Sequence, residues 1–89
     1  MLKSVNITLK GKLYKSGFRF YILEKGVKLG IKGYVKYINN RDIFIHAVGS
    51  EDALQEFALW CGKGNLSCKV ESIEVIPAEV EEFANFNIK

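Results

Sequence analysis

The sequence predicts one α+β domain with the ferredoxin-like βαββαβ sandwich, in which an antiparallel sheet has two helices on one face. Its 89 residues are enough for one core and too few for two. The shares of hydrophobic and charged residues, 48% and 26%, are those of an ordinary globular protein. Apolar periods typical of strands and helices alternate in the order strand, helix, strand, strand, helix, strand. Residues 1–89 are therefore predicted to form a single domain.

The first strand and helix are predicted from a change of period. A strand is indicated by the alternation of Val5, Ile7 and Leu9 with polar residues, and it ends at Gly11. A helical stripe then begins and contains Phe18, Ile22, Gly26 and Leu29. Gly26 weakens a helix, so we expect close packing against it. Gly30 ends the helix.

Two strands joined by a tight turn follow. Residues 31–37 and 42–48 have strand character, and residues 38–41 lie between them. The Asn39-Asn40 pair tolerates the left-handed backbone that a hairpin turn requires. His46 is expected on the open face of the sheet, away from the helices.

The second half of the chain supplies a helix and the last strands. Ser50 is predicted to cap the helix, whose buried stripe is Leu54, Phe57 and Cys61, with Ala53 and Trp60 flanking. Residues 69–76 predict a strand that Pro77 closes, and a change of phase within it suggests a bulge. Its expected buried anchors are Val70, Ile73 and Val75. A short final strand is expected from Phe83, Phe86 and Ile88.

Composition narrows the function classes. A net charge of +3 suits a small anionic ligand and is too weak to argue for nucleic acid. The first ten residues lack the apolar core of a secretory signal, and no apolar run has the length of a membrane span, so we expect a monomeric cytoplasmic protein. Cys61, Cys68 and His46 form no metal-binding pattern, and no cofactor is expected. The two cysteines are expected to be free thiols, although a disulfide between them stays open.

The stretch KLYKSGFRFY, residues 12–21, joins the first strand to the first helix. Amides at a helix N-terminus lack intrahelical acceptors, and the helix dipole favours negative charge there. Arg19 in the first turn adds a guanidinium fork suited to phosphate oxygens. The predicted phosphate-binding residues are Tyr14, Lys15, Ser16, Gly17, Phe18 and Arg19. The alternative is a solvated basic turn.

Two segments resemble the signatures of the acylphosphatase family. GKLYKSGFRF, residues 11–20, is similar to its phosphate cradle, and GYVKYINNRD, residues 33–42, to its second signature. The resemblance continues through KLGIKGYVK, SEDALQEFALWCGKG and FANFNIK, and covers nearly the whole chain. It implies metal-independent hydrolysis of carboxyl phosphates. In this family an arginine and loop amides hold the phosphoryl group, and an asparagine positions the attacking water.

Only some of the family's catalytic positions hold the expected residue type in this sequence. Arg19 falls on the catalytic arginine, whereas Lys15 falls on a glycine of the cradle and Tyr37 on the water-positioning asparagine. A phenol reaches farther than a carboxamide and is rigid, so Tyr37 is expected to clash or to point elsewhere, and turnover is expected to be low or lost. Asn39 substitutes only if the turn folds back.

Three functions follow from these observations. The first is an acylphosphatase, impaired by Tyr37, which acts on small acylphosphates. The second is an inactive module that binds phosphate or another small anion. The third is an RNA-binding sheet, because KGYVKY (residues 32–37) superficially resembles an RNA-recognition motif and Tyr34, Tyr37 and Phe44 offer rings. The position of that segment directly after the first helix, and the small charge, argue against the third.

Overall fold

The computed structural model describes residues 2–11, 13, 17–39, 41–64 and 70–89. Its elements follow the predicted order, including the expected short final strand, which begins at Phe86 and leaves Phe83 outside it. They are β1 (Lys3–Gly11), α1 (Phe18–Lys28), β2 (Lys32–Ile38), β3 (Asp42–Gly49), α2 (Glu51–Lys63), β4 (Val70–Pro77) and β5 (Phe86–Ile88).

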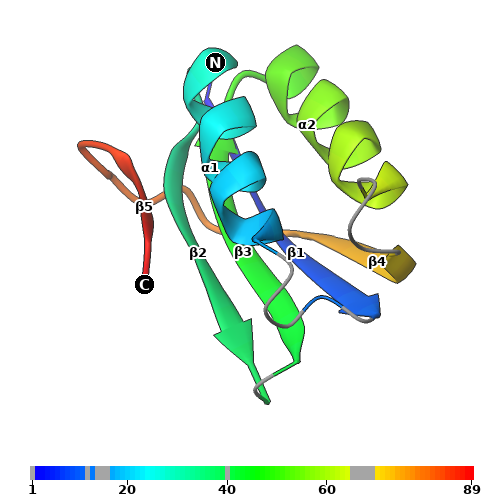
Figure 1. Cartoon of the computed structure of the whole chain (residues 1–89). Coiled ribbons are helices and arrows are strands. Elements are labelled where there is room, and N and C mark those ends of the chain that lie inside the picture. The colour runs from blue at the N-terminus through cyan, green and yellow to red at the C-terminus, as the bar shows by residue number, and fades with distance from the viewer. Residues whose placement is uncertain (1, 12, 14–16, 40, 65–69) are drawn as a thin grey trace.

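The five strands form one sheet with the order β4-β1-β3-β2-β5. The pairings β1–β3, β1–β4 and β2–β3 are antiparallel, and the expected ferredoxin-like fold is confirmed. The terminal strand β5 instead pairs parallel with β2, which makes the sheet mixed. Both helices cover the same face (Figure 1). Neither described helix has the length and apolar content needed to cross a membrane.

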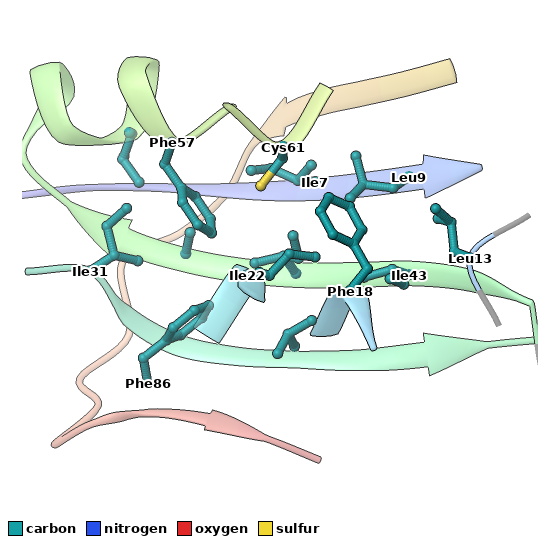
Figure 2. Packing of buried hydrophobic residues seen from close by; sticks show 14 residues of the cluster. Ile7, Leu9, Leu13, Phe18, Ile22, Ile31, Ile43, Phe57, Cys61 and Phe86 are labelled. Carbon is teal, nitrogen blue, oxygen red and sulfur yellow. The ribbon is translucent and has the colours of Figure 1, made fainter. Parts of the chain in front are cut away.

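The core lies between this face and the helices (Figure 2). The stripe of α2, formed by Leu54, Phe57 and Cys61, is buried as predicted. In α1 the buried residues are Phe18, Ile22 and Gly26, while Leu29 is half-buried against the same cluster. An added methyl at Gly26 would lie 2.4 Å from a ring carbon of Phe86, which confirms the expected close packing.

The predicted helix and turn signals are found where the structure describes them. The Ser50 hydroxyl accepts a 3.2 Å hydrogen bond from the backbone N–H of Ala53 at the start of α2. Gly30 follows α1 with φ 72°, and Asn39 has φ 55° in the turn between β2 and β3. The positions of Asn40 and Cys68 lie outside the described residues. Cys61 is a free, buried thiol.

The expected anchors of the fourth strand are partly wrong. Val70 packs against the core, but Ile73 and Val75 are 39% and 44% exposed. The reason is the strand order, because β4 lies at the edge of the sheet and α2 covers it only in part. The predicted bulge is confirmed: Lys10 is opposite Ser72 and Gly11 opposite Val70, which leaves one residue of β4 unmatched.

The open face of the sheet is partly covered by the segment of residues 78–85. His46 lies on that face as predicted, yet it is only 6% exposed. Its Nδ1 lies 2.6 Å from Asn6 Oδ1, and its Nε2 lies 3.3 Å from Ser4 Oγ and 3.7 Å from a carboxylate oxygen of Glu81. Because Asn6 Oδ1 only accepts, Nδ1 donates, and in the neutral ring Nε2 accepts from the Ser4 hydroxyl. The Phe83 ring, 5.4 Å from His46 between centroids, and the Ala78 N–H, which donates to the Ser4 carbonyl, hold the segment 78–85 against β1 and β3.

Candidate active site

The loop between β1 and α1 is held at both ends by core residues. Leu13 and Phe18 are fully buried, and both point into the hydrophobic cluster (Figure 2). The Phe18 ring also stacks on Trp60, with 5.7 Å between ring centroids. Core packing therefore fixes the described residues on both sides of residues 14–16.

Gly17 makes the sharp entry into α1. Its φ of 78° and ψ of 2° are left-handed, a conformation that glycine adopts without steric penalty. The Gly17 carbonyl accepts a 3.1 Å hydrogen bond from the backbone N–H of Phe20, which starts the helix. Among the described residues, no side chain caps the start of this helix. Its first turn also contains no acidic residue that would compensate the positive end of the helix dipole.

Arg19 and Tyr37 lie together beside this loop. The Arg19 Cζ atom is 4.2 Å from the centroid of the Tyr37 ring, in cation–π geometry. The Tyr37 hydroxyl donates a 3.2 Å hydrogen bond to the Leu13 carbonyl. Both side chains are partly exposed, so the pair is open to solvent. Among the described residues, no carboxylate forms an ion pair with Arg19.

The strand register explains how Tyr37 reaches the loop. Gly33 and Val35 are buried and lie on the helix-covered face of β2, and Tyr37, two residues further, shares that face. The ring packs against the core while the hydroxyl reaches the start of the loop. The ring lies beside the guanidinium of Arg19 and its hydroxyl points to the Leu13 carbonyl, so the phenol fits at this position. The expected loss of turnover stays a prediction.

The described site thus contains a guanidinium fork, a left-handed glycine and the start of a helix, which is a set suited to an oxyanion. Gly17, Phe18 and Arg19 lie at the start of α1, and their role in phosphate binding stays a prediction. The predicted contributions of Tyr14, Lys15 and Ser16 lie outside the described residues. No group of three His, Cys, Asp or Glu in the described part of the chain is placed to hold a metal ion.

Comparison with known proteins agrees with this arrangement. The family model for acylphosphatase matches residues 5–88. The chain belongs to the acylphosphatase family. It is 31% identical over 87 residues to an acylphosphatase of Vibrio parahaemolyticus, covering 98% of this chain and 97% of that protein. It is 33% identical over 88 residues to one of Thermotoga maritima, covering 99% and 98%.

A solved acylphosphatase has nearly the same backbone. The crystal structure of the Bacillus subtilis acylphosphatase superposes with a TM-score of 0.93 at 30% identity, covering 100% of this chain and 99% of that one. The family therefore accounts for the whole described fold of this acylphosphatase-like chain, including the short terminal strand that makes the sheet mixed.

The aromatic residues of the open face are packed among themselves. Tyr34 lies 5.8 Å from His46 and 5.9 Å from Phe83 between ring centroids, and Lys89 Nζ is 4.1 Å from the Tyr34 centroid. The chain's own residues thus cover much of this ring. RNA binding at this face stays a prediction from sequence. The sequence did not indicate the network around His46, because its partners come from β1 and residues 78–85, which are distant in the chain.

Proposed function

We propose that this acylphosphatase-like chain binds the phosphoryl group of small carboxyl phosphates beside Arg19 and hydrolyses them slowly. The pairing of Arg19 with Tyr37 is the observation that carries the proposal. It supplies a guanidinium without a described acidic partner, next to the left-handed Gly17 and the N-terminus of α1. Family membership supplies the reaction class, which the fold alone does not.

The reaction converts R–CO–O–PO₃²⁻ and water into R–COO⁻ and H₂PO₄⁻. The bond between phosphorus and the bridging oxygen breaks, that oxygen leaves with the carboxylate, and the water oxygen joins phosphorus. Phosphoryl transfer needs mainly positioning and stabilisation of charge on the equatorial oxygens. Arg19 suits this role because its fork donates two hydrogen bonds to one phosphoryl group.

Slow turnover follows from the side chain at position 37. The resemblance between GYVKYINN and the second family signature assigns Tyr37 to the asparagine that positions the attacking water. The Tyr37 hydroxyl is directed at the Leu13 carbonyl, 3.2 Å away, and the ring faces Arg19. A carboxamide that holds water is therefore absent from this position. Misplacing a reacting group by about 1 Å can lower a rate by on the order of 100-fold.

Hydrolysis of benzoyl phosphate tests the proposal, with the native chain compared to Arg19→Ala and Tyr37→Asn. We expect a slow, saturable native reaction that Arg19→Ala abolishes and Tyr37→Asn accelerates by about 10- to 100-fold. Asn39→Ala is the matched control, because Asn39 is an exposed turn residue two positions from Tyr37. Its rate is expected to equal that of the native chain.

The outcomes separate the candidate functions. Fast native turnover that Arg19→Ala abolishes would contradict the assigned role of Tyr37. Binding of phosphate without hydrolysis by either the native chain or Tyr37→Asn would favour an inactive anion-binding module. Loss of the native rate in Asn39→Ala would transfer the water-positioning role to Asn39.

A further inference from the structure

Among the described residues, Tyr37 contacts two parts of the site from the two ends of one rigid side chain. Its ring lies under the guanidinium of Arg19, which belongs to the first turn of α1. Its hydroxyl donates to the carbonyl of Leu13, which belongs to the end of the loop nearest β1. One residue of β2 therefore connects both sides of the proposed anion site.

The cation–π contact has a consequence for the arginine. Arginine carries five N–H donors, and a contact with a ring face pairs none of them with an acceptor atom, so they remain available to an anion. A long arginine side chain loses rotamer freedom when it binds a ligand. The ring of Tyr37 restricts this freedom before the anion arrives, which lowers the entropic loss on binding.

The hydroxyl contact has a parallel consequence for the loop. Leu13 is fully buried, so its side chain is fixed, and the hydrogen bond from the Tyr37 hydroxyl fixes its carbonyl as well. Phe18, also fully buried, fixes the other end. An asparagine at position 37 is shorter and has no ring face, and it supplies neither contact in this form.

We propose that Tyr37 is a positioning residue that preorganises Arg19 for a bound phosphate and holds the Leu13 carbonyl beside it. This inference rests on the proposed anion site and adds that position 37 favours retention of the anion over its hydrolysis. Tyr37→Asn is therefore expected to change two quantities in opposite senses. It raises the turnover of benzoyl phosphate and weakens the binding of inorganic phosphate.

A purely structural role is the competing explanation, because the Tyr37 ring also packs against the core. The two roles differ in how they depend on Arg19. If Tyr37 acts through Arg19, replacing Tyr37 matters for phosphate only while Arg19 is present. If it is only a packing residue, its replacement alters stability equally with and without the arginine and has no particular effect on phosphate affinity.

Phosphate affinity is measured by calorimetric or NMR titration with inorganic phosphate. The variants are Tyr37→Phe, Tyr37→Leu, Arg19→Ala and the double variant Arg19→Ala/Tyr37→Leu. We expect Tyr37→Phe, which retains the ring, to weaken binding about threefold, and Tyr37→Leu about tenfold. In the Arg19→Ala background, where residual binding is measured at high phosphate, Tyr37→Leu is expected to change affinity by less than about twofold.

Tyr34→Leu is the matched control, because Tyr34 is a tyrosine of the same strand with a lysine over its ring, but it lies on the opposite face. Its phosphate affinity is expected to stay within about twofold of the native value even where its unfolding midpoint falls. Thermal unfolding of each variant shows that it is folded at the titration temperature. If Tyr37→Leu does not fold, Tyr37→Phe still tests the hydroxyl contact.

The results distinguish failure of this inference from failure of the proposed function. Native binding that Arg19→Ala weakens but Tyr37→Leu and Tyr37→Phe leave intact would overturn the positioning role and keep the anion site. An equal loss from Tyr37→Leu with and without Arg19 would also overturn it, in favour of packing. Absence of phosphate binding by the native chain would overturn both proposals.

Discussion

Replacement of Gly26 by alanine sets two known effects against each other. Gly26 is buried in the middle of α1, where alanine favours the helix by about 1 kcal/mol over glycine. The same methyl group would lie 2.4 Å and 2.5 Å from two ring carbons of Phe86, well inside van der Waals contact. One atom therefore both improves the helix and overfills the core.

The cost of overfilling the core is expected to exceed the gain in helix propensity. Phe86 is 5% exposed and its ring meets Phe57 edge-on, with 5.9 Å between centroids, so it has little room to retreat. Overfilling a packed core costs about 1–3 kcal/mol, and displacing Phe86 also disturbs the short β5 pairing with β2. The net change is a destabilisation of up to about 2 kcal/mol. For a domain of this size each kcal/mol lowers the melting temperature by about 4–8 °C.

Gly62 provides the matched control in the other helix. A methyl group there would lie 3.7 Å from the nearest atoms of Ile73, an ordinary contact. Gly62→Ala is expected to stabilise the chain by about 0.5–1 kcal/mol. Thermal and urea unfolding followed by circular dichroism measure both variants. Equal stabilisation by Gly26→Ala and Gly62→Ala would refute the packing argument, and Phe86→Leu should reduce the loss caused by Gly26→Ala.

Two further predictions concern buried groups. Burial raises the pKa of the Cys61 thiol, so in a Cys68→Ser background the thiol should react with an aromatic disulfide reagent only as fast as the protein unfolds. Because the unfolded thiol ionises above its ordinary pKa and the folded one does not, stability should fall as pH rises above about 8.5. The free energy of unfolding then falls by up to about 1.4 kcal/mol per pH unit, and Cys61→Ala should lack this pH dependence. Gly33→Ala should destabilise strongly, because its methyl group would collide with the His46 carbonyl and its φ is 130°; unfolding midpoints check this.

Most of the fold was predictable because its signals are local. The alternation in β1, the stripe of α2, the Ser50 cap and the left-handed Asn39 depend on residues a few positions apart. The exposure of Ile73 and Val75 was not predictable in this way. It depends on which strand forms the edge of the sheet, and the sequence of β4 has the same apolar residues that a central strand would have.

The candidate site also has parts that local sequence predicts and parts that depend on distant elements. The identity of Arg19 and its place in the first turn of α1 were predictable from the start of the helix. The direction of Tyr37 was not, because it depends on the phase of β2 relative to a loop that is remote in sequence. The register of β2 places the ring beside Arg19 and the hydroxyl at the Leu13 carbonyl.

Core packing anchors the chain on both sides of the candidate site. Leu13 and Phe18 are fully buried in the hydrophobic cluster, and the Tyr37 hydroxyl adds a hydrogen bond to the Leu13 carbonyl. On the proposed function, a change at position 37 therefore leaves the fold largely intact while it alters both phosphate affinity and the position of water. Overall similarity to the family depends on the core, whereas the proposed rate depends on this one side chain. Comparison of Tyr37→Asn with the native chain in the hydrolysis and binding assays separates these two dependences.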